Sequence, residues 1–192
     1  MTPDSGAAPV FAAFLGAEFD ALAYAVRAGH DVRGPLAMKG RARVTRGTSL
    51  WSRGLAGLFR FPPAADDVAV AVTMTPQNGG EFWERRFGAR RFTSFLKVQD
   101  GAMTETFGPF TFTLGLHVAD GMLFYPVKAG RLGPVPLPKF LMPQSIAREF
   151  EADDRFHFDV QLLAPLTGAL MVHYQGWLEP EDVPIVADAD AP

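Results

Sequence analysis

The sequence has no cysteine among its 192 residues. Disulfides, zinc–thiolate sites, iron–sulfur clusters and cysteine nucleophiles are therefore excluded. A strong excess of one charge is also lacking, since the formal net charge at pH 7 is -3 and the pI is near 5.8. We therefore expect no dominant electrostatic attraction to nucleic acid or to an anionic membrane.

Long apolar runs are missing too, because no segment approaches the roughly 18 residues that a membrane-spanning helix needs. The first thirty residues carry Asp4, Glu18 and Asp20 but no basic leader, which argues against a secretory signal. Phosphate-binding glycine loops, dinucleotide fingerprints and the serine-hydrolase elbow are absent from the sequence. We expect a cytoplasmic protein with neither a metal nor a bound cofactor.

The length of the chain suits one domain, and its 48% hydrophobic residues can form a large core. We expect a disordered N-terminal segment over 1–9, a single β-rich domain over 10–179 and an acidic disordered tail over 180–192. Apolar residues recur every three or four positions from Phe11 to Val26, which predicts a helix over 10–28 that ends at Gly29. A second, shorter helix is predicted after Thr48 or Ser49, ending before Pro62 and Pro63.

The remainder of the chain is typical of strands and tight turns. Asn78-Gly79-Gly80, Asp100-Gly101 and Asp120-Gly121 are hairpin signals between segments rich in β-branched and aromatic residues. The predicted strands are 36–46, 68–75, 82–87, 91–99, 102–107, 110–118, 122–128, 146–151, 156–163 and 169–178. This pattern predicts a mostly β, α+β fold: a strongly curved antiparallel sheet or barrel of about nine or ten strands, with the helices against its concavity or mouth.

The turns also predict which side chains face inward. A two-residue turn at Asp100-Gly101 pairs Leu96 with Glu105, and a turn at Gly88-Ala89 pairs Arg85 with Phe92. The same argument places four polar or amphipathic residues, together with Trp83, on the otherwise apolar face: Arg85, Ser94, Glu105 and Tyr125. Because a buried charge is costly unless it is paired, these residues form either a satisfied structural network or the polar end of a pocket.

Two other polar patterns have simpler explanations. Lys39, Arg41 and Arg43 alternate along one strand, as expected for a solvated sheet face rather than a nucleic-acid surface. His157, Asp159 and His173 resemble a metal triad, but Phe156 and Phe158 take the opposite parity, so the polar strip is expected to face water.

A further set of residues, spread over most of the chain, carries a family likeness. These are Phe14-Leu15-Gly16 with Phe19, Val26-Arg27 with His30, Val44 with Arg46-Gly47, Trp83 with Arg85 and Phe87, Glu105 with Phe107-Gly108-Pro109, Leu132-Gly133 with Pro136 and Pro138, Glu149, and the closing Tyr174, Gly176 and Trp177-Leu178. In them the chain resembles the bacterial domain-of-unknown-function family 4166. The resemblance implies association with NAD(P)-dependent oxidoreductase-like domains. We expect no such domain within this chain.

Three functions remain open at this stage. The first is binding of an apolar molecule, lipid-like, isoprenoid-like or polyketide-like, in a cavity whose lining residues would be Trp83, Arg85, Ser94, Glu105, Tyr125, Glu149 and Tyr174. The second is catalysis with Glu105 as general acid or base and Arg85 or Tyr125 stabilising negative charge. The third is an accessory role beside a separate oxidoreductase, through Phe140, Leu141 and Met142 in the proline-rich segment 134–143.

Overall fold

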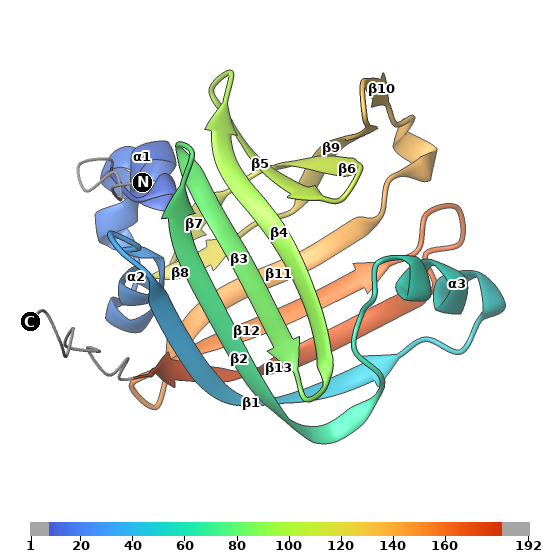
Figure 1. Cartoon of the computed structure of the whole chain (residues 1–192), viewed down its shortest axis with the longest axis horizontal. Helices are drawn as coiled ribbons and strands as arrows, with labels where there is room; N and C mark the ends of the chain where they lie inside the picture. The colour runs from blue at the N-terminus through green and yellow to red at the C-terminus, as the bar shows by residue number, and fades with distance from the viewer. Residues whose placement is uncertain (1–7, 182–192) are drawn as a thin grey trace, which may run out of the picture.

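The structure is a computed structural model that describes residues 8–181. Most of the chain forms one strongly curled antiparallel sheet, in which the first and the last strand along the chain pair with each other in the middle of the strand order (Figure 1). The strands are β1 (Leu36–Arg46), β2 (Ala65–Gln77), β3 (Gly80–Phe87), β4 (Arg90–Gln99), β5 (Ala102–Phe107), β6 (Phe110–Leu114), β7 (His117–Ala119), β8 (Met122–Phe124), β9 (Val127–Leu132), β10 (Val135–Pro136), β11 (Gln144–Ala152), β12 (Arg155–Leu163) and β13 (Leu170–Pro180). The helical elements are α1 (Val10–Leu15), the 3-10 helix η1 (Gly16–Ala21), α2 (Tyr24–His30), α3 (Leu50–Leu58) and the 3-10 helix η2 (Lys139–Leu141).

The mostly β, curved antiparallel architecture is confirmed, but the strand number and the barrel are corrected. Thirteen strands are hydrogen-bonded in the order β10-β9-β6-β5-β4-β3-β2-β1-β13-β12-β11-β8-β7, and the order does not close. Two of the predicted strands, 110–118 and 122–128, are each broken in the middle, at Gly115-Leu116 and at Tyr125-Pro126. Proline has no N–H for a ladder, so the break at Pro126 follows from the sequence.

The broken strands place one long hairpin at both edges of the sheet. Its β6 and β9 extend the edge next to β5, whereas its tip, β7 and β8, pairs with β11. Two backbone hydrogen bonds hold the crossing, Gly115 N–H to Pro126 O at 2.8 Å and Tyr125 N–H to Ala147 O at 3.2 Å. The hairpin therefore links the two edges of the curled sheet covalently, at the place where the hydrogen-bonded ladder between the strands ends.

The predicted helix over 10–28 is wrong in its continuity. The chain instead forms α1, η1 and α2, because Gly16 has φ 56° and Leu22 is extended with ψ 143°. The apolar periodicity correctly identified the buried side, since Phe11, Phe19, Leu22 and Val26 all lie in the core. Gly29 is not a left-handed cap either: α2 continues to His30, and a Cβ on Gly29 would lie 2.9 Å from the Phe156 ring.

The N-terminal helices are fixed to the sheet by two carboxylates from strands. Glu81 on β3 accepts a hydrogen bond from the N–H of Val10, the first residue of α1, at 3.0 Å. Glu151 on β11 accepts one from the N–H of Ala25 at the start of α2, at 2.5 Å. Carboxylates are favourable at helix N-termini, where backbone N–H groups lack intrahelical partners. The sheet thus supplies caps that the residues preceding these helices, Pro9 and Ala23, do not provide.

We expect Glu81 to make stability depend on pH in an unusual direction. Burial raises the pKa of Glu81 above its ordinary value of 4.5, although the hydrogen bonds from Trp83 and Val10 and the nearby His30 oppose the shift. Above pH 4.5 the unfolded chain loses a proton that the native state keeps, so this stabilising contribution is lost as the pH rises through the raised pKa. Urea unfolding of wild type and Glu81→Gln should therefore show the free-energy difference between them falling as the pH is raised from 4.5. A free-energy difference between the two proteins that stays constant with pH would contradict this prediction.

Two local predictions are confirmed residue by residue. The strand predicted over 36–46 has these bounds in β1, with Met38, Ala42 and Val44 buried and the basic residues between them exposed. Its outward Lys39, Arg41 and Arg43 form ion pairs with Glu181, Asp67 and Asp66. Ser49 caps α3 by accepting a hydrogen bond from Ser52 N–H.

The core lies on the concave side of the sheet, where α1, η1 and α2 cover one end (Figure 1). It is rich in aromatic rings, and Phe87 contacts both Phe92 on β4 and Tyr174 on β13. The expected tail lies mostly outside the described residues, as do residues 1–7, although β13 continues through Pro180. Among residues 8–181 no helix is long and apolar enough to cross a bilayer.

Candidate functional site: a cavity with a polar cluster

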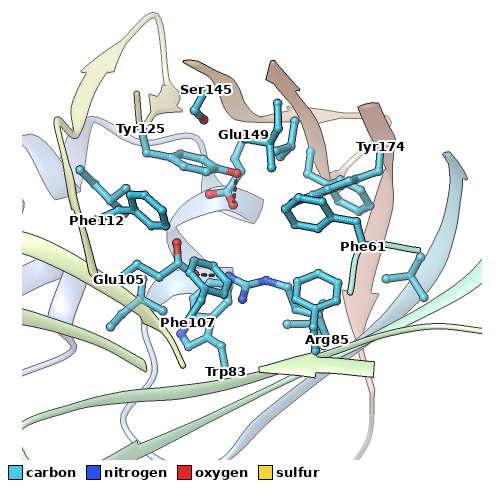
Figure 2. Close-up of a pocket in the computed structure, with 18 of the residues that line it drawn as sticks. Phe61, Trp83, Arg85, Glu105, Phe107, Phe112, Tyr125, Ser145, Glu149 and Tyr174 are labelled. Carbon is cyan, nitrogen blue, oxygen red and sulfur yellow. Dashed lines mark hydrogen bonds and ion pairs between the residues drawn. The ribbon is translucent and has the colours of Figure 1, made fainter. Parts of the chain in front are cut away.

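The concave side of the sheet contains a partly open cavity of about 140 Å³. A cavity of about this size can hold a molecule as large as benzene. Aromatic and aliphatic side chains from both halves of the sheet line most of it, among them Met74, Phe112, Val160 and Met171. Polar side chains gather within this apolar lining: Arg85, Glu105, Tyr125, Ser145, Glu149 and Tyr174 (Figure 2).

Arg85 and Glu105 reach the cavity because of the strand register. Leu96 pairs with Glu105 and Arg85 pairs with Phe92, as the two turns predicted. Both residues of the Asp100-Gly101 turn have positive φ, 52° and 74°, as a two-residue hairpin turn of type I′ requires. The inward orientation of the two charges therefore comes from turn chemistry rather than from any preference of Arg or Glu for burial.

The two inward charges pair with each other through a serine. The Arg85 guanidinium donates to Glu105 Oε1 at 3.1 Å and to Ser94 Oγ at 2.7 Å. Ser94 in turn donates to Glu105 Oε1 at 2.7 Å. The guanidinium carbon also lies 4.6 Å from the centre of the Trp83 ring, within cation–π distance. Arg85 is thus held by Trp83 on its own strand β3, by Ser94 on β4 and by Glu105 on β5, and it retains little freedom to move.

A second carboxylate, Glu149 on β11, faces this group from the opposite wall (Figure 2). Its Oε2 lies 2.5 Å from His30 Nε2, and its Oε1 accepts a hydrogen bond from the Tyr125 hydroxyl at 3.2 Å. His30 is 1% exposed, and its Nδ1 has no partner among residues 8–181. The contact with Glu149 therefore holds the buried ring through Nε2 alone.

Both tyrosines of the cluster stay protonated at neutral pH. Burial raises the pKa of Tyr174 to about 12, with Arg85 opposing the shift and Glu105 and Glu149 adding to it. Burial also raises the pKa of Tyr125 well above its ordinary value, and the Glu149 charge acts in the same direction. The cavity therefore presents two phenolic O–H groups beside two carboxylates and one guanidinium.

Six of the seven predicted lining residues border the cavity: Trp83, Arg85, Glu105, Tyr125, Glu149 and Tyr174. The seventh, Ser94, is buried behind the wall and links Arg85 to Glu105. Sequence reasoning did not single out Glu81 or the contact between His30 and Glu149. Glu81 shares the parity of Trp83 and Arg85, so extending the inward face by one more residue would have found it.

The outward strip on β12 and β13 behaves as a polar surface. Asp159 lies 2.7 Å from His173 Nε2 and accepts from Arg148 at 3.1 Å, and it remains partly exposed. Within the described part of the chain no three acidic, histidine or cysteine side chains cluster as metal ligands would.

The family likeness is confirmed over most of the chain, although Phe14-Leu15-Gly16 and Phe19 lie outside the matched residues. A search of curated proteins returned no match. A family model described as "Domain of unknown function (DUF4166)" matches residues 22–178, a range that contains all of the strands from β1 to β12 and most of β13. It also includes every polar side chain of the cavity. The chain therefore belongs to this domain-of-unknown-function family.

Proposed function

We propose that the protein binds an apolar small molecule, of lipid-like, isoprenoid-like or polyketide-like chemistry, in the cavity of the curved sheet. The observation that carries this proposal is the cavity itself: apolar walls around a small group of fixed polar side chains. Ligand sites in proteins have this composition, in which apolar surface supplies affinity and a few polar groups fix orientation. A purely structural ion pair would not require the space beside it.

A ligand also needs a way in, and the cavity is not sealed. Val127, Pro143 and Ser145 border both the cavity and a surface groove lined by the proline-rich segment around Phe140. This supports entry beside that segment, at the end of the sheet away from the N-terminal helices. The enclosed volume suits one ring or a short chain, so a longer molecule would extend into the groove.

Filling the cavity should weaken binding without altering the surface. Leu162 on β12 lines the cavity, whereas the adjacent Gln161 is outside it. Leu162→Trp is expected to weaken binding of N-phenyl-naphthylamine about tenfold or more, because the indole occupies the space of the ligand. Fluorescence titration of the probe measures this, with farnesol and dodecanol as competitors.

Gln161→Trp is the matched control and should bind the probe as wild type does. Equal losses in the two variants, or no saturable binding to wild type, would contradict the proposal. Circular dichroism of both variants establishes that the sheet is intact.

Catalysis by Glu105 is a second candidate that rests on the same cavity. Glu105 touches the cavity, as an acid or base must touch its substrate. We place binding first because residues from both halves of the sheet and from the N-terminal helices enclose the space, whereas catalysis would engage the polar cluster alone.

An accessory role beside an oxidoreductase is favoured by one surface feature. Phe140 is 63% exposed, and Leu132, Val135 and Leu141 near it are exposed as well. Clustered exposed apolar side chains are typical of protein contacts. In that case the groove beside Phe140 would present the ligand to the partner enzyme.

A further inference from the structure

We infer that the ligand carries a neutral hydroxyl group into the polar cluster, so that it is an apolar alcohol or phenol rather than a carboxylic acid or an amine. This inference rests on the proposed function and specifies the chemistry of its ligand. The geometry points to it through the charges in the cavity wall and through two polar groups there that have unused hydrogen-bonding capacity.

The charges of the wall disfavour an anionic ligand. The wall carries two carboxylates, Glu105 and Glu149, against one guanidinium, Arg85. Arg85 is already paired with Glu105 and Ser94, and His30, which contacts Glu149, does not line the cavity. A ligand carboxylate would therefore meet like charges in an enclosed, apolar space, where repulsion is poorly screened.

Glu105 has one oxygen that lacks a donor. Its Oε1 accepts from both Arg85 and Ser94, whereas Oε2 accepts no hydrogen bond from residues 8–181. The side chain is only 12% exposed and lies at the cavity wall (Figure 2). This oxygen is an acceptor open to the cavity, so the wall favours a ligand group that donates.

Tyr174 complements Glu105, because it offers a hydrogen-bond donor to the cavity. Its hydroxyl makes no hydrogen bond with residues 8–181, although the ring lines the cavity. The phenol keeps its proton, because its pKa is about 12, and Glu105 is close enough to influence that pKa. Tyr174 can therefore donate to an acceptor on the ligand.

A hydroxyl group has the donor and the acceptor that the two partners can use. It donates to Glu105 through its O–H and accepts from Tyr174 through its lone pairs. An ammonium group donates but cannot accept, and an ether accepts but cannot donate. Of these three groups, only the hydroxyl of an alcohol or phenol can use both unoccupied positions of the cluster.

The test compares four molecules of the same shape at pH 7: para-butylphenol, para-butylanisole, para-butylbenzoate and para-butylbenzylamine. Displacement of N-phenyl-naphthylamine or calorimetry gives the dissociation constants. The phenol is expected to bind about tenfold or more tightly than each of the others, the advantage that a hydrogen bond to a charged group provides.

Two variants tie the preference to these side chains. In Glu105→Gln the amide oxygen can still accept from Arg85 and Ser94, but an N–H now faces the cavity, so the phenol should lose its advantage over the anisole. Tyr174→Phe should reduce the same advantage by an independent route, and it tests the inference even if Glu105→Gln fails to fold. Glu84→Gln, on the outer side of β3 where Glu84 pairs with Arg86, should leave the order of affinities unchanged.

The outcomes separate this inference from the proposed function. Equal binding of phenol and anisole, with the fluorescent probe still bound, overturns the hydroxyl assignment and leaves the cavity as a binding site. Tighter binding of the benzoate or the benzylamine also overturns it. Failure of all four molecules and of the probe to bind overturns both proposals.

Discussion

Replacing Gly176 with alanine is expected to destabilise the protein by about 3 kcal/mol or more. A Cβ at this position on β13 would lie 2.1 Å from the backbone oxygen of Arg41 and 2.8 Å from the Cα of Ala42. These atoms belong to β1, which is held between β2 and β13 by ladders on both sides. The backbone atoms of β1 therefore cannot shift to relieve the clash.

Gly54 provides the matched control for this prediction. It lies within α3, and a Cβ there would meet nothing within 4 Å. Gly54→Ala should stabilise the protein by up to about 1 kcal/mol, since alanine favours the helix over glycine. Urea unfolding of both variants measures the contrast. A Gly176→Ala variant within about 1 kcal/mol of wild type would show that β1 and β13 are farther apart than the structure places them.

Removal of Glu149 should have an effect of similar size for a different reason. Glu149→Leu is expected to cost about 3–5 kcal/mol, because it leaves buried His30 and the Tyr125 hydroxyl without their partner. Tyr125→Phe removes only one hydrogen bond and should cost about 1 kcal/mol.

The double variant His30→Phe with Glu149→Leu distinguishes this explanation from simple loss of packing. An apolar pair of similar volume removes the unpaired histidine and leaves only the Tyr125 hydroxyl without its partner, so the double variant should be more stable than Glu149→Leu alone. Chemical denaturation of the three variants completes the test. If the double variant is less stable than the single one, the penalty does not come from the unpaired histidine.

The sequence was most informative where local chemistry alone fixes the backbone. Asp100-Gly101 and Asp120-Gly121 adopt positive φ at both residues, so their hairpins and registers could be predicted. The breaks in the N-terminal helix could not be predicted in this way. The periodicity of Phe11, Phe19 and Val26 shows which residues are buried, but a helix in three segments buries them as well as a continuous one does.

The same distinction holds for the site. Arg85 and Glu105 were found because they are close to hairpin turns that transmit the register to them. His30 and Glu149 meet only where α2 packs against β11, 119 residues later in the chain, and Glu81 and Glu151 reach helix N-termini far away in the chain. No local pattern encodes such contacts, because they depend on which strands become neighbours.

The pairing of β1 with β13 has a consequence for how the chain folds as it is synthesised. Met38 pairs with Pro180, so the curled sheet cannot form until nearly the last described residue is available. Before then β1 has only β2 beside it, and its other edge is open. Contacts between such distant residues slow folding and prolong exposure of unpaired edges. Until β13 is available, the charged side chains of Lys39, Arg41 and Arg43 along β1 are suited to protect that edge from pairing with other chains.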